Sequence, residues 1–223
     1  MKKVFKAALV AAMVLVSVGA SAQIGINVGY VNTNRDMSSD GRSIDVSDVL
    51  VNPSNGLLIG VAGDLAIQGD LGISWGLNYT YSFGSKTLAE AMGMSAKLKS
   101  NDHYLDIPVR LTYSFPLSND LKLLAFAGPK FAYAIAGSTK VDVNGLPEGA
   151  EIDENEAMDH YGKKDEALFK PFDIKVGGGL GLQYGKYNLK AGYDFGLLNS
   201  ANTDNKDYSF KSNQFYVTLG FMF

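Results

Sequence analysis

The chain has 223 residues, a formal net charge of −3 and no cysteine. The lack of cysteine excludes a disulfide framework and a lipid anchor attached to cysteine. The mildly acidic balance argues against a nucleic-acid-binding surface, and the length predicts a single domain.

The first residues have the three parts of a secretory signal peptide. Three lysines precede an uncharged run from Ala7 to Ala22, which ends in the small-residue cleavage sequence Ala20-Ser21-Ala22. The run has 16 residues, fewer than the ~20 that a membrane-spanning helix needs. We therefore predict a signal peptide over residues 1–22, cleaved after Ala22, rather than an uncleaved anchor helix. The domain is predicted to cover 23–223.

An alternation of apolar with small or polar residues predicts that the rest of the chain forms strands. In the clearest case, thirteen residues alternate without interruption from Leu71 through Trp75 to Phe83. A period of two excludes a helix, and this length exceeds the ~9–11 residues that a tilted strand needs to cross a bilayer. Seven further segments repeat the pattern: 24–33, 57–67, 103–115, 121–136, 172–184, 187–197 and 213–223.

The connections between these segments alternate in length. Three are hairpin turns, at 68–70, 116–120 and 185–186, whereas four are long and polar, at 34–56, 84–102, 137–171 and 198–212. An even strand number with short turns at one end and long loops at the other is typical of outer-membrane barrels, whose short turns are periplasmic. The sequence therefore predicts an all-β fold, an eight-stranded antiparallel transmembrane up-and-down β-barrel.

Two long connections leave the secondary structure open. The spacing from Thr87 to Glu90 is that of a capping box and predicts a short helix, with a strand extension as the alternative. A hairpin around Asn144-Gly145 would add two strands and make a ten-stranded barrel.

The alternation by itself does not say which face of the barrel points outward, because a soluble barrel of lipocalin type would hold its apolar face inside. Aromatic residues gather near the strand ends, as at Tyr81 and Phe83 or at Tyr113 and Phe115. Aromatic girdles of this kind lie at the two membrane interfaces. The opposite face is rich in glycine, alanine and serine, which suits a narrow interior. Both features favour the membrane barrel.

The last strand ends the chain on an aromatic residue. Its apolar face carries Phe215, Val217, Leu219, Phe221 and Phe223. We expect it to pair with 24–33 and so close the barrel. A terminal phenylalanine resembles the signal read by the outer-membrane assembly machinery. The predicted location is the bacterial outer membrane, with outer-membrane lipid and that machinery as partners.

Several stretches carry a resemblance to a known family. They are Ala127-Gly-Pro-Lys-Phe-Ala-Tyr133, Phe172-Asp-Ile-Lys-Val-Gly-Gly-Gly-Leu-Gly-Leu-Gln-Tyr184, Gly192-Tyr-Asp-Phe-Gly-Leu-Leu-Asn199 and the terminal Phe223. The chain resembles the small porin-like outer-membrane β-barrel domains, in the group that includes the PorT-like proteins. The resemblance implies a barrel and carries over no catalytic residue. Some PorT-like members are associated with protein secretion, which makes a secretion-apparatus component one alternative function.

Charged residues interrupt the face that is predicted to line the lumen. They are Asp64, Asp106, Arg110, Lys122, Lys130, Asp173, Lys175, Lys190 and Asp194. Strand direction predicts Arg110 in the periplasmic half and Asp194 toward the outside, with both signs at both levels. Unpaired charges in a narrow barrel are costly, so pairing into a plug is expected. A narrow ion-conducting path is the alternative.

Catalytic and metal-binding signals are weak. His103 follows Asp102 at the predicted outer rim, with Ser100 nearby, and some outer-membrane lipid-modifying enzymes place such groups there. We expect a solvated histidine and no enzyme activity, because the spacing does not define a triad. The connection 137–171 contains His160 and several acids: Glu148, Glu151, Asp153, Glu154, Glu156 and Asp159. It lacks the EF-hand order, so we predict a solvated loop without metal, and no cofactor.

These features predict a membrane-embedded structural or interaction protein with four external loops and a largely plugged lumen. The alternatives are a narrow porin-like channel, a secretion-apparatus component and, last, a rim-sited lipid-modifying enzyme. The sequence does not identify a partner for the external loops.

Overall fold

The computed structural model describes residues 22–39, 42–44, 54–91, 94–144, 158–161, 167–202 and 207–223. The predicted signal peptide, except Ala22, and the possible hairpin turn at Gly145 lie outside these ranges. Across the described ranges, no helix is long and apolar enough to cross a membrane.

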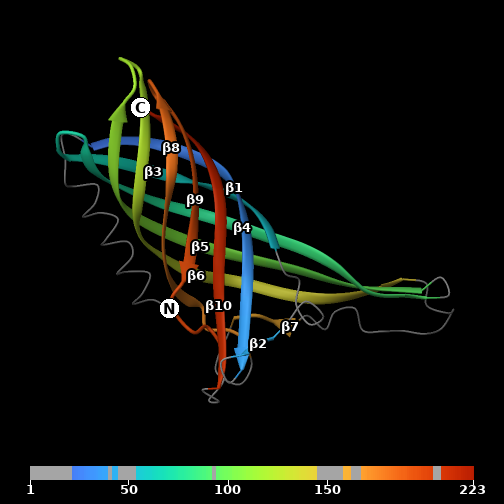
Figure 1. The fold of residues 1–223 in the computed structure, drawn as a ribbon. Coiled ribbons are helices and arrows are strands. Elements are labelled where there is room, and N and C mark those ends of the chain that lie inside the picture. The colour runs from blue at the N-terminus through green and yellow to red at the C-terminus, as the bar shows by residue number, and fades with distance from the viewer. Residues whose placement is uncertain are drawn as a thin grey trace.

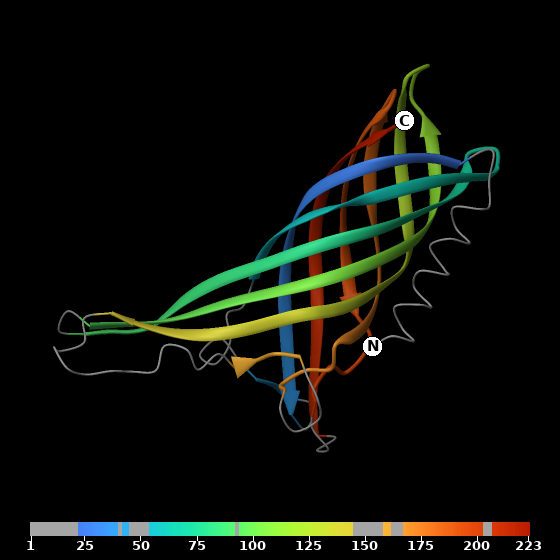
Figure 2. The same ribbon diagram turned by 180° about the vertical axis from the view of Figure 1, so that it is seen from behind.

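Eight long strands form a closed antiparallel ring (Figures 1 and 2). They are β1 (Ala22–Ser39), β3 (Ser54–Gln68), β4 (Leu71–Ala91), β5 (Met94–Pro116), β6 (Leu121–Asn144), β8 (Phe172–Tyr184), β9 (Tyr187–Gly196) and β10 (Tyr208–Met222). The short strands β2 (Arg42–Ile44) and β7 (Met158–Asp159) pair with β1 and β6 and take no place in the ring. The predicted all-β, eight-stranded antiparallel class is confirmed.

The last strand closes the ring against the first, as its apolar pattern predicts. Ile26 lies opposite Phe221 and Tyr30 opposite Val217 in the β1–β10 register. The terminal Phe223 extends this pairing, because its backbone N–H donates to the backbone carbonyl of Ile24 at 2.8 Å. The closed ring leaves no unpaired edge within this part of the barrel.

The two faces of the sheet differ as the alternation predicts. Large apolar side chains point outward and stay exposed, as with Ile26 at 51% and Leu57 at 61% of their surface. Polar side chains on the other face are buried, among them Thr80 and Ser82 on β4. An apolar outer surface around a polar interior is the arrangement of a barrel that has lipid as its solvent.

Three tight turns lie at the end of the barrel that holds the C-terminus (Figure 1). Two of them need a backbone that glycine adopts readily, at Gly69 (φ 58°) and Gly185 (φ 54°). The turn between β5 and β6 follows Pro116. These turns confirm the predicted hairpins at 68–70, 116–120 and 185–186.

At the opposite end, β4, β5 and β6 continue beyond the other strands as a three-stranded projection (Figures 1 and 2). We call residues 84–91, 94–102 and 137–144 the outer wing. The predicted helix at Thr87–Glu90 is wrong, because Lys86 and Thr87 pair with Leu98 and Lys97 of β5. Cross-strand pairing satisfies their backbone groups, which outweighs the local capping signal.

Candidate functional site

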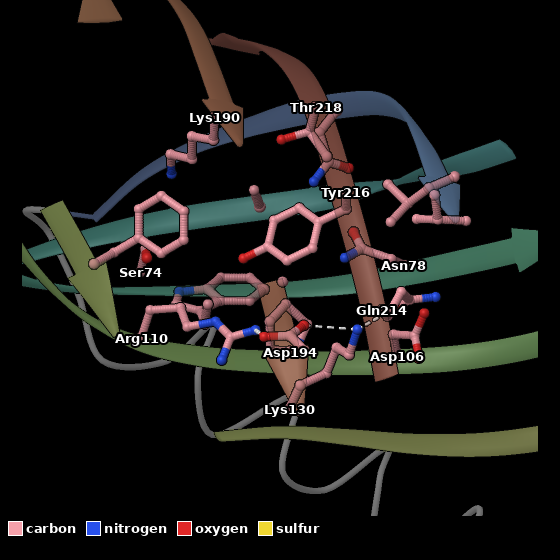
Figure 3. Close-up of a pocket in the computed structure, with 18 residues that line it drawn as sticks. Ser74, Asn78, Asp106, Arg110, Lys130, Lys190, Asp194, Gln214, Tyr216 and Thr218 are labelled. Carbon is pink, nitrogen blue, oxygen red and sulfur yellow. Dashed lines mark hydrogen bonds and ion pairs between the residues drawn. The ribbon is translucent and has the colours of Figure 1, made fainter. Parts of the chain in front are cut away.

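The interior of the barrel holds a cluster of three ionised side chains and one amide side chain from four strands (Figure 3). Asp194 of β9 forms two ion pairs. Its Oδ1 lies 2.7 Å from Nη2 of Arg110 on β5, and its Oδ2 lies 2.8 Å from Nζ of Lys130 on β6. Lys130 also donates to the side-chain carbonyl of Gln214 on β10. We call Arg110, Lys130, Asp194 and Gln214 the central cluster.

The central cluster joins strands that are not neighbours in the sheet. β6 and β8 lie between β5 and β9 in the ring, and β8 and β9 lie between β6 and β10. The Arg110–Asp194 and Lys130–Gln214 contacts therefore each bridge two intervening strands inside the barrel, and the Arg110 guanidinium also donates to the backbone carbonyl of Gly128 on β6. Asp194 and the charged ends around it are almost entirely buried.

The backbone beside the cluster makes room for it through a missing side chain. A Cβ added at Gly177 of β8 would collide with the carbonyl oxygen of Tyr193 and with the carboxylate of Asp194. This close approach explains why a glycine occupies position 177 on the narrow interior face.

The other predicted lumen charges make separate contacts, although Asp106 and Lys190 line the same cavity as the central cluster. Asp173 and Lys175 pair at 3.2 Å, and the Lys175 ammonium also donates to Ser212. Asp64 and Lys190 approach to 3.8 Å. The carboxylate of Asp106 instead accepts a hydrogen bond of 2.7 Å from Thr80.

Lys122 differs from these residues, because its side chain is exposed. It lines a cavity of about 260 Å³ at the end with the short turns, together with Asp64 and Gln183. A second cavity of about 80 Å³ adjoins the central cluster and is lined by Asn27 and Asn78. The larger cavity is mainly polar and is large enough to hold water.

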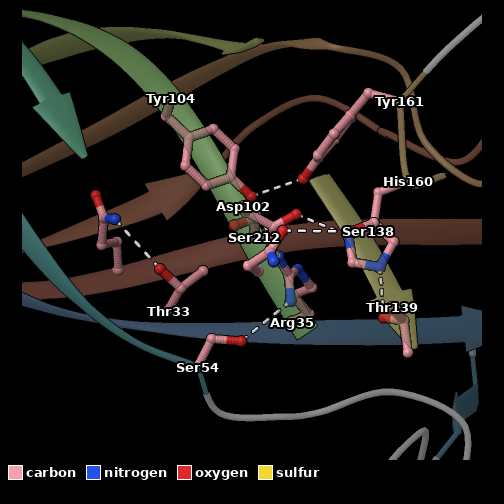
Figure 4. Close-up of polar contacts among 12 residues, drawn as sticks. Thr33, Arg35, Ser54, Asp102, Tyr104, Ser138, Thr139, His160, Tyr161 and Ser212 are labelled. Atoms are coloured by element: carbon pink, nitrogen blue, oxygen red, sulfur yellow. Dashed lines mark hydrogen bonds and ion pairs between the residues drawn. The ribbon is translucent and has the colours of Figure 1, made fainter. Parts of the chain in front are cut away.

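A second cluster lies toward the long-loop end of the barrel (Figure 4). Asp102 of β5 forms an ion pair with Arg35 of β1, and its other oxygen lies 2.7 Å from Nδ1 of His160. Nε2 of His160 lies 2.6 Å from the hydroxyl of Thr139 on β6. We call these four residues, with Tyr104 and Tyr161, the outer cluster.

Tyr161 ties the connection between β6 and β8 to the barrel. Its hydroxyl lies 2.6 Å from that of Tyr104, which in turn accepts a hydrogen bond from Arg35. Burial raises the pKa of Tyr161 well above its ordinary value, so the phenol stays neutral. Its ring packs with Phe169 and Phe210, which cover the outer cluster with apolar surface.

The rim site suggested by the sequence does not form. Asp102 points into the barrel, whereas His103 points outward, where its Nδ1 lies 2.6 Å from the hydroxyl of Tyr79. Successive residues of a strand face opposite sides of the sheet, so His103 and Asp102 cannot act on one substrate atom.

The expectation of a solvated loop is wrong at His160, because this residue is 1% exposed. β7 pairs with β6 through Met158 and Asp159, and so brings His160 over the barrel. Asp159 itself is exposed. The predicted acids Glu148, Glu151, Asp153, Glu154 and Glu156 lie outside the described residues. Within the described part of the chain, no three His, Cys, Asp or Glu residues are placed to hold a metal ion.

The sequence assigns Arg110 and Asp194 to opposite halves of the barrel, but it does not predict that their side chains meet in an ion pair. Barrel strands tilt and are staggered in register, so residues three strands apart shift along the axis. Arg35 was missed because it falls in a predicted loop. The signal was present, since Val31, Thr33 and Arg35 continue the inward alternation of β1.

Comparison with known proteins adds a family to this geometry. Residues 17–202 match the family described as "Outer membrane protein beta-barrel domain". A search of the curated proteins gives no match.

Several solved structures are similar over most of their length. Ail, the attachment invasion locus protein of Yersinia pestis, is 12% identical, with 91% of this chain and 99% of that chain covered and a TM-score of 0.37. Neisserial surface protein A is 15% identical, with coverage of 91% and 99% and a TM-score of 0.41. OprG from Pseudomonas aeruginosa is 12% identical, with coverage of 91% and 96% and a TM-score of 0.41.

The family match covers most of the chain and agrees with the closed ring and its apolar outer surface. The chain therefore belongs to the outer membrane protein β-barrel domain family and is a transmembrane β-barrel of the bacterial outer membrane.

Proposed function

We propose that this protein is a structural or interaction barrel whose lumen is plugged by paired charges. The observation that carries the proposal is the central cluster, in which Arg110, Lys130 and Asp194 link non-adjacent strands across the interior. Mutual pairing lowers the cost of burying these charges, and it also fills the space that an ion would need. External loops would then supply the contacts with other molecules.

The outer cluster supports the same proposal at a second level. Arg35 and Asp102 also lie on strands that are not neighbours, β1 and β5, and their side chains are nearly inaccessible. Phe169 and Phe210 cover this level from outside. An ion entering from the exterior would have to displace both layers in turn.

Planar-bilayer recording of the purified protein tests the plug. The wild-type protein should show no steady conductance above a protein-free detergent control. The triple variant Arg110→Ala, Lys130→Ala, Asp194→Ala removes the central cluster without leaving an unpaired charge, and it should conduct more than the wild type. A steady wild-type current would overturn the proposal.

A narrow porin-like channel is the second candidate, and the two lumen cavities favour it. The cavity of about 260 Å³ at the short-turn end already admits Lys122 and Gln183 to solvent. The cavity of about 80 Å³ lies further along the interior, beside the central cluster. The same recording decides between a plug and a channel, because only a channel conducts without mutation.

We propose a non-enzymatic role, although Asp102, His160 and Thr139 form a row with the spacing of an acid, a base and a hydroxyl nucleophile. Two observations support a structural role for this row. Thr139 is only 9% exposed, and Asp102 is engaged by Arg35 as well as by His160. Loss of a lipid-hydrolysing activity in Thr139→Ala would contradict this proposal.

The finer resemblance to the PorT-like group stays a prediction, as does a role in a secretion apparatus. Affinity purification of the protein from native membranes tests the role in a secretion apparatus. Recovery of secretion components in stoichiometric amounts would favour that role over an isolated barrel.

A further inference from the structure

An open groove lies on the outward face of the outer wing, next to where the wing leaves the barrel. Its volume is about 770 Å³, and its walls come from β3, β4, β5 and β6. The side chains that matter below are Tyr81, Phe83, Lys99, Asn101, Lys140 and Asp142. None of them belongs to the central or the outer cluster.

Two aromatic side chains form one wall of the groove. Tyr81 and Phe83 are 36% and 42% exposed, and their ring centroids lie 5.7 Å apart. They end the outward apolar series of β4 that begins on the lipid-facing surface with Leu77 and Tyr79. Aromatic side chains at this position mark the membrane interface. The groove therefore starts where lipid headgroups lie.

Lysine side chains form the facing wall. Lys99 and Lys140 are directly opposite each other on β5 and β6, and both are exposed. Like charges in this arrangement destabilise a sheet. Asp142 forms an ion pair with Lys99, whereas Lys140 has no ion-pair partner in the part of the chain that the structure describes. The pair therefore keeps an excess of positive charge that a bound anion would relieve.

Lys97 strengthens this excess. It lies opposite Asp142 in the β5–β6 register, so three lysines and one aspartate lie on this face of the two strands. Asn101 adds a side chain that can donate a hydrogen bond below the lysines. The groove thus combines apolar contact at the membrane level with anion-binding groups just above it.

We propose that this groove binds a phosphate-bearing lipid of the outer leaflet, with the phosphate between Lys99 and Lys140. The lipid-facing surface below Tyr81 would hold the acyl chains, and Phe83 would contact the headgroup. Continuity with that surface favours a lipid over a soluble anionic partner. Basic groups at the membrane surface attract anionic headgroups by about fivefold in affinity for each lysine.

The test uses the full-length mature protein in detergent micelles, titrated with bisphosphorylated lipid A and followed by native mass spectrometry. Lys140→Gln should weaken binding about fivefold, and Lys99→Gln with Lys140→Gln about 25-fold. Lys211→Gln is the matched control, because Lys211 is an exposed lysine on β10 and takes no part in the groove. Its affinity should equal that of the wild type.

Two further ligands separate the possible sources of the anion and need no variant. Dephosphorylated lipid A should bind the wild type at least tenfold more weakly, and inorganic phosphate should not displace the bound lipid. Equal binding of the dephosphorylated lipid would overturn the proposal, since contact would then be apolar only. Displacement by inorganic phosphate would overturn it as well, and so would unchanged affinity in the folded double variant. Heat-modifiable gel mobility confirms folding in each case.

Discussion

The central and outer clusters both bridge the barrel, yet they differ in what supplies their groups. Every member of the central cluster comes from one of the long strands that form the wall of the barrel, namely β5, β6, β9 and β10. The outer cluster also uses His160 and Tyr161, which belong to the connection between β6 and β8. Their ionised groups are about equally buried.

Because of this difference, we expect the two clusters to have different roles, although their side chains are about equally buried. The central cluster can form only when the strands close into the ring, so it should contribute to the stability of the barrel as a whole. The outer cluster holds a connection in place over the lumen, so it should govern how accessible that connection is. Local opening of such a segment does not require the barrel to unfold.

The largest effect is expected from Asp194→Ala. This change leaves Arg110 and Lys130 buried without their carboxylate, and breaking a buried pair in this way costs about 3–5 kcal/mol. The measurement is the urea midpoint of the folded barrel, read from heat-modifiable gel mobility. We expect a clear decrease in that midpoint relative to the wild type.

The control for Asp194→Ala replaces all three charged groups with apolar ones: Arg110→Met, Lys130→Met and Asp194→Leu. Apolar replacement of a buried ionic cluster is often neutral or stabilising, so this variant should regain most of the lost stability. An Asp194→Ala barrel as stable as the wild type would show that the central cluster does not hold the strands together.

The architecture could be predicted from the sequence, because the outward face of every strand meets the same solvent. Alternation from Leu77 to Phe83 and in the last strand reports directly on that solvent, whereas Trp75 of the same series is only 8% exposed. The closure of β10 on β1 follows from the pattern of the last strand. The inward positions of Asp194 and Arg110 follow in the same way. The contact between Asp194 and Arg110 could not be predicted, since it depends on strand tilt and stagger, which the alternation of a single strand does not encode.

The outer cluster was less predictable for a different reason. Arg35 continues the alternation of β1 but lies beyond the apolar outward series that marks the strand, so the strand end was placed too early. His160 has no periodic neighbours, and only the pairing of β7 with β6 brings it to Asp102. Long-range pairing of a two-residue strand leaves no pattern in the sequence.

An intermediate effect is expected from His160→Ala. The substitution removes the contacts with Asp102 and Thr139, and each lost hydrogen bond costs about 0.5–1.5 kcal/mol. Limited proteolysis between β6 and β8 should become several-fold faster, while the urea midpoint of the barrel stays nearly unchanged.

The matched control for His160→Ala is His103→Ala, since the His103 ring lies on the outward surface, where it contacts Tyr79 and Tyr81. Its proteolysis rate should equal that of the wild type. A decrease in the urea midpoint of His160→Ala as large as that of Asp194→Ala would remove the distinction between the two clusters.

The smallest effect is expected at the short-turn end, where Asp64 and Lys190 form the longest lumen ion pair among the described residues. Their charged atoms are 3.8 Å apart, and the Asp64 side chain is 35% exposed beside the cavity that also admits Lys122 to solvent. Water screens such a pair, and exposed pairs contribute about 0–1 kcal/mol. Asp64→Asn should therefore shift the urea midpoint by much less than Asp194→Ala, and 0.5 M NaCl should abolish the shift. A large, salt-independent loss would mean that this end of the lumen is as dry as the central cluster, and that the plug extends to the periplasmic mouth.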